Sequence, residues 1–305
     1  MIKEYLKRFK IWLNYKRYLS SRERYVEKKA RKLLGYQINL NNPVTFNEKL
    51  QWLKLYWYDE RVPRCVDKYE VREYVKGKGL GDLLIPLHGV YDNFEEIDFS
   101  GLPAKYVIKV THNSGGVVVV NESSPLNIDE ARKKINNSLS RNYFFQSQEW
   151  VYKNLMPRII CEKYIEPEDG SVPKDYKFFC FDGKVKFLFV ASDRGTKNNI
   201  CTTKFDFYTP EWEQIEVEQG YKRSTAPIQK PDNLSDMIRI AEKLSDDFPH
   251  VRVDLYNESN KIYFGELTFF HFSGTTKFVP EKYDEIFGEY LNIDNISKVV
   301  YADEQ

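Results

Sequence analysis

The chain has 305 residues, of which 42% are hydrophobic and 30% charged, with only 15 glycines and 13 prolines. It is long enough to bury a substantial core, and its composition excludes collagen, intrinsic disorder and a small disulfide scaffold. The net charge of +1 hides an asymmetry, because residues 1–34 carry 12 Lys and Arg against 3 Asp and Glu, whereas the remainder carries 34 against 42. The body is therefore mildly acidic, and only the leading segment is basic.

Several features favour a cytoplasmic location. No apolar run approaches the ~20 residues that span a bilayer, and the charged start MIKEYLKRFK does not resemble a secretory signal. The four cysteines show no C-x-x-C spacing, and all lie among apolar residues: Cys65, Cys161, Cys180 and Cys201. We expect them to be reduced core residues, as in cytosolic proteins.

Residues 2–34 are predicted to form a basic amphipathic helix. Apolar side chains recur at helical spacing at Ile2, Leu6, Phe9 and Leu13, and no proline or glycine interrupts the segment. Such a helix can lie on an anionic membrane surface. The alternatives are a helix that packs its apolar side on the protein's own body and a nucleic-acid-binding helix. A single basic helix on an acidic body argues against nucleic acid as a partner.

The rest of the chain mixes helices and strands. Thr45 and Glu48 form a capping box at the start of a helix expected within residues 41–60. Further helices are expected near residues 67–79, 128–140, 144–155, 233–246 and 280–291, and strands at 83–92, 106–110, 117–120, 158–165, 251–256 and 261–270, with several short strands over 176–208. No repeat or flexible linker separates these segments, so we expect an α+β chain of two or three tightly joined units.

A lysine in the middle of an apolar strand is the first candidate for chemistry. Lys109 lies within YVIKV and is followed by the small residues of THNSGG at 111–116. A buried ammonium needs a partner, a phosphate is an obvious one, and small residues let backbone N–H groups approach an anion. The sequence is not a P-loop. The alternative is a lysine on the wet face of an edge strand that leads into an ordinary glycine hairpin.

The last two strands carry a second polar cluster. Arg252 and Asp254 share one face of their strand, as Glu266 and Thr268 share one face of the next. A three-residue turn at 258–260 would put Arg252 opposite Glu266, and a one-residue slip would separate the polar groups. Two carboxylates and a hydroxyl suit Mg²⁺, and the arginine could stabilise developing negative charge. The alternative is a cross-strand salt bridge on a wet face.

The remaining candidates carry weaker signals. The strand IICEKYI over 159–165 could offer backbone hydrogen bonds to a planar ligand, although a plain core strand has the same pattern. The four histidines have no zinc-site spacing: His88, His112, His250 and His271. The pair Asp246-Asp247 at a helix end does not by itself support a sugar-nucleotide metal site.

In order and in type, these features resemble the ATP-grasp enzymes, of which the D-alanine–D-alanine ligases are the familiar example. More closely, the chain resembles the TupA-type ATP-grasp family, named for a teichuronopeptide-synthesis protein. The resemblance covers about residues 41–290 and rests on TFNEKLQWLK (45–54), DKYEVREYV (67–75), LLIPLHGVYD (83–92), LPAKYVIKVTHNSGG (102–116) and RVDLY…FGELTFFHFSG (252–274).

The resemblance implies an ATP-grasp fold, in which two α+β subdomains clasp ATP. We expect a helical extension over residues 1–40, a preceding subdomain over 41–104, a small lid subdomain over 105–170 and a catalytic subdomain over 171–305. The N-terminal helical segments lie outside the region of resemblance.

The resemblance also implies roles for individual residues. The catalytic residues would be Arg252 and Lys109, and the Mg²⁺ ligands Asp254, Glu266 and Thr268, the last standing where asparagine is common. ATP would be bound by Lys68 and Lys109, the loop residues Ser114, Gly115 and Gly116, the adenine hinge Glu162, Lys163, Tyr164 and Ile165, and Asp175 at the ribose. Proximity to the expected centre suggests substrate contacts at Arg194, His271, Ser273 and Gly274.

The implied activity is an ATP- and Mg²⁺-dependent carboxylate–amine ligase that acts through an acyl phosphate. Family context suggests bacterial capsule or exopolysaccharide synthesis, with an amino acid or other amine joined to a uronic acid or a peptide branch. The basic N-terminal helix could then contact the cytoplasmic membrane face. The alternatives are a glycosyltransferase, for which we find no sugar-nucleotide site, an ATP-dependent sugar kinase, and a non-catalytic scaffold, against which the retained polar residues argue.

Overall fold

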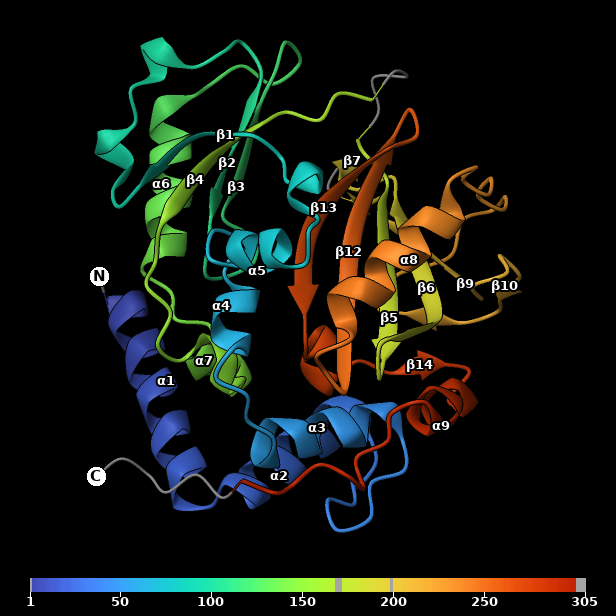
Figure 1. The fold of residues 1–305 in the computed structure, drawn as a ribbon. Helices are drawn as coiled ribbons and strands as arrows, with labels where there is room; N and C mark the ends of the chain where they lie inside the picture. The colour runs from blue at the N-terminus through green and yellow to red at the C-terminus, as the bar shows by residue number, and fades with distance from the viewer. Residues whose placement is uncertain (1, 168–171, 198–199, 300–305) are drawn as a thin grey trace.

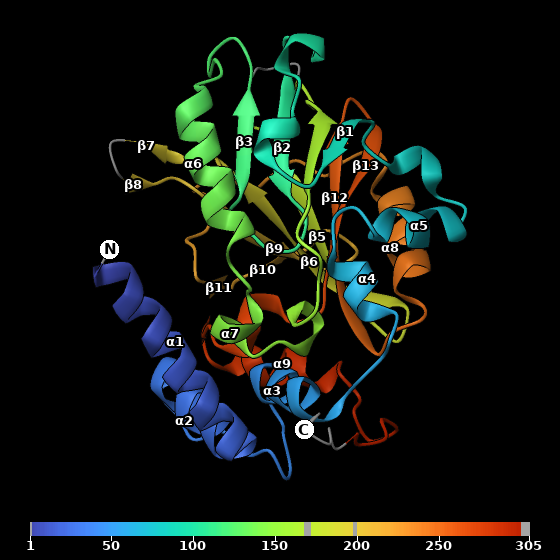
Figure 2. The same ribbon diagram turned by 90° about the vertical axis from the view of Figure 1, so that its left-hand side faces the viewer.

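Two antiparallel sheets, one of four strands and one of six, dominate the structure (Figure 1). This computed structural model describes residues 2–167, 172–197 and 200–299. The helix α6 (Ile128–Leu139) packs on strands of the small sheet, as the view turned by 90° shows (Figure 2). The predicted α+β class is confirmed.

The segment expected as one helix over residues 2–34 is in fact two helices, so that prediction was wrong. α1 (Ile2–Ser20) and α2 (Arg22–Leu34) are separated at Ser21, which has an extended φ of −163° and ψ of 93°. The two helices pack against each other at the edge of the molecule (Figure 2). Apolar spacing can continue through such a break, because serine at an N-cap leaves the helix without changing the hydrophobic period.

The described apolar side of this helix pair packs on the protein's own body. Its buried residues join one cluster with side chains from the segments that follow: Tyr18, Val26, Ala30 and Leu34. Of the predicted apolar positions, Ile2, Leu6 and Phe9 lie outside the described side chains. The exposed positions of α2 are mostly basic, so the pair presents charge outward.

The capping box predicted at Thr45 is confirmed. The Thr45 hydroxyl accepts a hydrogen bond from the Glu48 N–H at 3.2 Å, and the Glu48 carboxylate accepts one from the Thr45 N–H at 3.0 Å. These two bonds satisfy amides that a helix start leaves unpaired, and α3 (Phe46–Tyr56) begins at this point.

The helix expected over 67–79 is shorter than predicted. It is α5 (Val71–Gly77), which follows the one-turn helix α4 (Val62–Val66). The Asp67 carboxylate accepts hydrogen bonds from the N–H groups of the second and third residues after it, at 2.9 and 3.0 Å. This Asx-type turn competes with helix formation and delays the helix start.

The small sheet has the strand order β1-β4-β2-β3. Its members are β1 (Leu87–Tyr91), β2 (Tyr106–Val110), β3 (Val117–Val120) and β4 (Ile159–Lys163). β2 therefore lies inside the sheet, between β4 and β3. β1 comes from the segment that we assigned to 41–104, and the subdomain boundaries stay a prediction.

The helix expected over 144–155 is also interrupted. α7 (Phe144–Ser147) ends at Gln148, which has a left-handed φ of 61°, and a short 3₁₀ turn η4 (Trp150–Tyr152) follows. A non-glycine residue in this region is uncommon and cannot continue a right-handed helix.

The large sheet has the strand order β10-β9-β6-β5-β12-β13. Its strands are β5 (Asp175–Phe181), β6 (Lys184–Ser192), β9 (Lys204–Tyr208), β10 (Gln214–Ile215), β12 (His250–Glu258) and β13 (Lys261–Thr268). Two small ribbons pair β7 (Thr196–Lys197) with β8 (Ile200–Cys201) and β11 (Glu218–Gln219) with β14 (Phe278–Val279). The predicted helices near 233–246 and 280–291 are α8 (Leu234–Ser245) and α9 (Lys282–Glu289).

One face of the large sheet changes from aromatic to charged along its strands. α8 packs on the opposite face, against β12, β5 and β6. At the aromatic end, Phe179 meets Phe46 of α3 at 6.0 Å between ring centroids, and Phe187 stacks on Phe287 of α9 at 3.9 Å. Further along β5 the same face carries Lys177. Helices thus bury one half of this face, and the charged half is left to line a cavity.

The last hairpin reaches the predicted polar grouping by a different register. The turn has two residues rather than three, because the pairing continues to Glu258 opposite Lys261. Alone, this change would be the one-residue slip that moves the polar groups to opposite faces. An irregularity after Asp254 leaves one extra residue on β13, and Asp254 then lies opposite Glu266. The bulge therefore keeps the polar side chains of both strands on one face of the hairpin, where the shorter turn alone would have separated them.

The predicted cysteine environment is right at three positions and wrong at one. Cys65, Cys161 and Cys180 are buried and free, whereas Cys201 is exposed. Cys201 belongs to the two-residue strand β8, which within the described ranges pairs with β7 in a small ribbon separate from the two main sheets.

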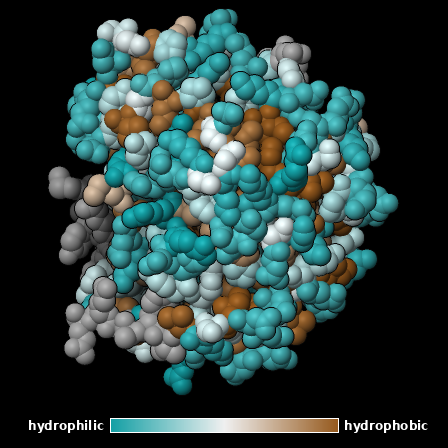
Figure 3. All heavy atoms as spheres, viewed as in Figure 1, coloured by the Kyte–Doolittle hydropathy of each residue, from teal (hydrophilic) through white to brown (hydrophobic). Residues whose placement is uncertain are grey.

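The surface seen in Figure 3 is mostly hydrophilic, with hydrophobic atoms gathered in patches, several of them in its upper half. Within the described ranges, no helix combines the length and the apolar character needed to cross a bilayer.

The contact between α9 and the start of α3 predicts a strong steric effect at Gly288. A Cβ atom there would lie 2.2 Å from the Val44 carbonyl oxygen and 2.8 Å from the Phe46 nitrogen. We expect Gly288→Ala to lower the free energy of unfolding by about 1–3 kcal/mol, because backbone on one side must move. Urea denaturation measures the change.

Gly77→Ala is the matched control. Gly77 also lies in a helix, α5, but no heavy atom lies within 4 Å of its would-be Cβ. Alanine should leave stability unchanged or raise it by up to about 1 kcal/mol. A Gly288→Ala protein as stable as the wild type would refute the close approach of α9 to α3.

Candidate active site

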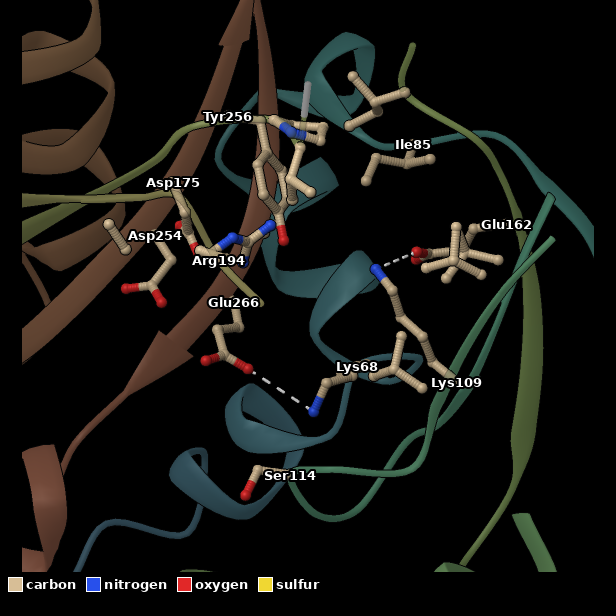
Figure 4. Close-up of a pocket in the computed structure, with 18 of the residues that line it drawn as sticks. Lys68, Ile85, Lys109, Ser114, Glu162, Asp175, Arg194, Asp254, Tyr256 and Glu266 are labelled. Atoms are coloured by element: carbon tan, nitrogen blue, oxygen red, sulfur yellow. Dashed lines mark hydrogen bonds and ion pairs between the residues drawn. The ribbon is translucent and has the colours of Figure 1, made fainter. Parts of the chain in front are cut away.

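A cavity of ≈670 Å³ lies between the two sheets and is lined by residues from both (Figure 4). The small sheet and its connections contribute Val107, Lys109, Val117, Val119, Glu162, Lys163, Tyr164 and Ile165, and the loop 111–116 contributes Asn113, Ser114 and Gly115. The large sheet contributes Asp175, Lys177, Ala191, Asp254, Tyr256 and Glu266, and Lys68 and Arg194 come from neighbouring segments.

Lys109 is a buried, charged group on an inner strand. Its ammonium lies 2.5 Å from the Glu162 carboxylate across the β2–β4 pair, and its side chain is 17% exposed. Burial alone would lower the pKa of Lys109, but Glu162, Tyr256 and Glu266 together outweigh burial and raise the pKa above its ordinary value. The alternative of a lysine on a wet edge strand is therefore wrong. The cation faces the cavity with one carboxylate as its partner (Figure 4).

The predicted hinge over residues 162–165 also borders the cavity. Glu162 uses its side chain for Lys109, and the Lys163 N–H donates to the Pro86 carbonyl at 2.9 Å. Tyr164 and Ile165 follow the end of β4 and line the cavity beside the apolar side chains of β2 and β3. The hinge role itself stays a prediction.

The loop 111–116 is pinned at one end and open at the other. The Asn113 amide donates to the Ser138 carbonyl at 2.8 Å and accepts from the Ser138 hydroxyl at 2.8 Å. At Gly116 a Cβ would lie 2.4 Å from the Ser138 oxygen, so glycine is required for this approach to α6. At Gly115 φ is +95° and nothing lies within 4 Å of a would-be Cβ. Ser114 and Gly115 thus form an open backbone rim suited to an anion.

Lys68 joins this loop to the large sheet. Its ammonium donates to the Asn113 carbonyl at 2.9 Å and lies 3.6 Å from the Glu266 carboxylate. Desolvation would raise the pKa of Glu266, but Lys68 and Lys177 lower it to about 2. Glu266 is therefore an ionised oxygen donor at the cavity.

Lys177 is a site residue that the sequence reasoning missed. On β5 it lies between two carboxylates, with its ammonium 2.7 Å from Asp175 and in direct contact with Asp254. The sequence contains a local sign of it, because DYKFFCF has a single lysine in a largely hydrophobic strand, as YVIKV has at Lys109. The same argument about the cost of burying an ammonium would have identified it.

The polar cluster predicted on the last hairpin exists and is not a wet salt bridge. Arg252 binds Asp254 in a bidentate pair, with both N–O distances at 2.7 Å, and the two residues are 7% and 1% exposed. The same Arg252 Nη2 lies 3.4 Å from Glu266 and 3.0 Å from the Thr268 hydroxyl. One guanidinium nitrogen thus meets oxygens from all three predicted metal ligands.

A chain of hydrogen bonds behind Arg252 holds it in place. Its Nη1 donates to His271 Nδ1 at 2.6 Å, the His271 Nε2–H donates to the Gln219 oxygen at 2.8 Å, and the Gln219 amide donates to the Thr276 carbonyl at 3.1 Å. Burial and the nearby Arg252 lower the pKa of His271 far below its ordinary value, which keeps the ring neutral and able to accept. No local signal in the sequence pointed to Gln219, because its role depends on the pairing of β11 with β14.

The predicted substrate residues fall into two groups. Arg194 lines the cavity. His271 is 1% exposed behind Arg252, and the backbone of Ser273 and Gly274 accepts hydrogen bonds from Gln51 of α3 at 2.8 and 2.6 Å. None of these last three lines the cavity, and their contact with substrate stays a prediction.

The oxygen donors fit a divalent cation. Asp254 and Glu266 lie opposite each other on the hairpin, line the cavity and meet the same guanidinium nitrogen, with the Thr268 hydroxyl beside them. Over the described ranges, no group of three or more His, Cys, Asp or Glu side chains could hold a metal by itself. Mg²⁺ at a phosphate site takes only one or two carboxylates and completes its shell with phosphate and water, so two carboxylates suffice.

Solved structures with some likeness to the chain include ATP-utilising ligases. A D-alanine–D-alanine ligase from Bacillus anthracis, complexed with ATP, has a TM-score of 0.38 at 17% identity, covering 67% of this chain and 54% of that one. An L-amino acid ligase from Bacillus licheniformis has a TM-score of 0.43 at 16% identity, covering 79% and 52%. The ADP complex of N5-carboxyaminoimidazole ribonucleotide synthetase has a TM-score of 0.41 at 20% identity, covering 73% and 50%. The match spans about half the length of each of these structures.

No curated protein matches the chain significantly. The family model described as TupA-like ATPgrasp matches residues 48–292, which is most of the sequence and leaves out the N-terminal helix pair. That range contains both sheets and the residues of the cavity described above. The resemblance noted in the sequence is thereby confirmed, and the chain belongs to the TupA-like ATP-grasp family.

Proposed function

We propose that this protein is an ATP- and Mg²⁺-dependent ligase that joins a carboxylate to an amine through an acyl phosphate. The observation that carries the proposal is the cavity between the sheets. Lys68, Lys109 and Lys177 line it together with Asp254 and Glu266, the two carboxylates that contact Arg252. Several cations that line one cavity suit a polyanionic ligand, and membership of the TupA-like ATP-grasp family supports ATP as that ligand.

The two ends of the cavity would divide the work of binding ATP. Val107 and Val119 give the lid side an apolar lining next to Tyr164 and Ile165, which suits a planar base. Lys109, Lys68 and the open rim at 114–116 would hold the phosphates, and Asp175 would meet the ribose. Asp254, Glu266 and Thr268 would hold Mg²⁺, which when bound supplies positive charge to the phosphate oxygens.

The proposed reaction needs positioning rather than a side-chain nucleophile. An acceptor carboxylate oxygen attacks the γ-phosphorus and ADP leaves, giving an acyl phosphate. An amine nitrogen then attacks the acyl carbon, loses a proton and expels phosphate, leaving an amide. Arg252, fixed by Asp254 and His271, would stabilise the charge on the reacting oxygens.

We further propose that the acceptor is a carboxylate-bearing sugar or glycan and that the amine is an amino acid or similar compound, in bacterial capsule or exopolysaccharide synthesis. A kinase that phosphorylates a sugar hydroxyl would use the same cavity. A glycosyltransferase would need a second, sugar-nucleotide site. Neither alternative has an observation that favours it over the ligase.

Product analysis tests the ligase against both alternatives. Purified protein with ATP, Mg²⁺, D-glucuronate and a panel of amino acids should release ADP and phosphate only when uronate and amine are both present. Asp254→Asn and Glu266→Gln should lower turnover at least about 100-fold, because each removes an anionic oxygen donor at the phosphates. Circular dichroism should be unchanged.

Asp246→Asn is the control for these variants, because Asp246 forms an ion pair with Lys78 but lies outside the cavity. If phosphate is retained on the sugar, the protein is a kinase rather than a ligase. If UDP is released from UDP-sugars, it is a glycosyltransferase. Near-normal turnover in both cavity variants would refute the metal assignment.

Lys109 should matter for nucleotide affinity. Lys109→Met removes the ammonium and should weaken ATP binding by about tenfold or more, measured by isothermal titration calorimetry. Lys105→Met is the matched control, because Lys105 precedes the same strand but pairs with Glu122 and Glu166 outside the cavity. Equal affinities of the two variants would contradict a phosphate role for Lys109. Adding Glu162→Gln to Lys109→Met avoids leaving a lone buried carboxylate.

A peripheral membrane contact is the proposed role of the N-terminal helix pair. Because the described apolar side of α2 faces the body, the contact would be electrostatic, through exposed residues such as Arg24, Lys28 and Arg31. The protein should sediment with vesicles containing phosphatidylglycerol, but not with neutral phosphatidylcholine vesicles. Changing these three residues to Glu should abolish sedimentation.

Charge reversal of exposed basic residues elsewhere, at Lys184, Lys222 and Arg239, is the control and should leave vesicle binding intact. Equal sedimentation of the wild type and the α2 variant would reject the membrane role.

A further inference from the structure

Part of the cavity lining, which we call the arm, is not used by the proposed nucleotide site. Beyond Asp175 and Lys177, the lining continues across the large sheet to Ala191 on β6, Phe205 on β9 and Tyr221 after β11. The apolar base-binding end belongs instead to the small sheet. The arm is therefore formed mainly by the large sheet.

A row of aromatic rings connects this arm to the reacting arginine. The Arg252 guanidinium lies 6.0 Å from the centroid of the Phe189 ring. Phe189 stacks on Phe205 at 4.2 Å and 25°, and Phe205 contacts Tyr221 at 4.4 Å. Phe189 and Phe205 are buried, whereas Tyr221 is half-buried and lines the cavity. The row ends in a ring available to a ligand that reaches Arg252.

Polar groups line the same arm. Arg194 binds Asp175 through Nη1 at 3.1 Å, and its guanidinium lies 5.7 Å from the Tyr256 centroid. Among the described residues, no hydrogen bond satisfies the buried Arg194 Nε. The Thr203 side chain also lines the arm. The arm thus combines an aromatic face with a spare N–H donor and a hydroxyl.

One short segment supplies both the arm and the support of Arg252. Gln219 reaches His271, and Tyr221, two residues later, reaches the arm. Gly220 between them has a φ of +72°, and a Cβ there would lie 3.4 Å from the Phe272 ring. A ligand that packs on Tyr221 would therefore contact the element that orients Arg252.

This combination fits a sugar ring. A pyranose has a face of C–H groups that packs on an aromatic ring and an edge of hydroxyls that takes hydrogen bonds, whereas a small aliphatic acid has no such face. Resting on the proposed function, we infer that this arm binds the pyranose ring of the carboxylate acceptor. Tyr221 packs on the ring face, and Arg194 and Thr203 bind its hydroxyls, with the carboxylate directed to Arg252.

Steady-state kinetics with D-glucuronate tests the arm. Tyr221→Ala should raise the KM for glucuronate by about tenfold or more, which corresponds to about 1.4 kcal/mol, and change the KM for ATP by less than about twofold. Tyr221→Phe keeps the ring and should recover most of the loss. Tyr283→Ala on α9 is the matched control, because Tyr283 also packs half-buried on the main core but lies outside the cavity. It should leave both KM values unchanged.

The outcomes separate this inference from the proposed function. An unchanged KM for glucuronate in a folded Tyr221→Ala protein would refute sugar binding in the arm, but it would not contradict the proposed ligase activity. If no combination of uronate and amine yields ADP, the proposed ligase activity is rejected. Saturation-transfer NMR with methyl β-D-glucuronide on the nucleotide-loaded protein then tests whether the arm binds a sugar. Sugar binding in the arm is supported if the pyranose ring protons are saturated in the wild type and in Tyr283→Ala, but not in Tyr221→Ala. No saturation in the wild type overturns it.

Discussion

Charge compensation inside the cavity is the constraint on which the rest of the site depends. Buried ammonium and guanidinium groups are tolerated only with partners, and here carboxylates provide them: Glu162 for Lys109, Glu266 for Lys68, and Asp254 for Lys177 and Arg252. These pairs hold the cations at fixed positions from both sheets. In the proposed complex with ATP, the phosphate chain would replace one anion by another at cations that are already in place, so little reorganisation would be needed.

The hairpin β12–β13 shows how far a strand pattern predicts such a site. Alternation correctly placed Arg252 with Asp254 and Glu266 with Thr268, because side chains two apart share a face. It did not predict the partner across the ribbon, since the turn is shorter by one residue and a bulge compensates near Gly265. A glycine in an otherwise regular strand is the local sign of such a bulge. The functional grouping survived the wrong register because the shorter turn and the bulge each shift the pairing by one residue, and a total shift of two residues keeps every side chain on its predicted face.

Whether other features could be predicted depends on how far apart in the sequence the residues that determine them lie. The capping box at Thr45 and the lysine of β2 are local, and the structure contains both. The break at Ser21 and the turn at Asp67 depend on small polar residues that the hydrophobic period does not register. The contact between Gln219 and His271 joins residues 52 positions apart, and only the fold brings them together.

A left-handed turn at Phe272 and Ser273, after β13, accepts several hydrogen bonds from α3 close to the residues that hold Arg252. Phe272 and Ser273 have φ values of 46° and 58°, which cost about 1–2 kcal/mol each for residues with a Cβ. The buried Lys54 donates to the Ser273 carbonyl at 2.8 Å, and Gln51 donates to the same oxygen. Hydrogen bonds of this kind, one of them from a lysine, contribute about 1–3 kcal/mol each and can offset the strain. The strained turn directly follows His271, so the bonds from α3 that stabilise it also fix the ring that orients Arg252.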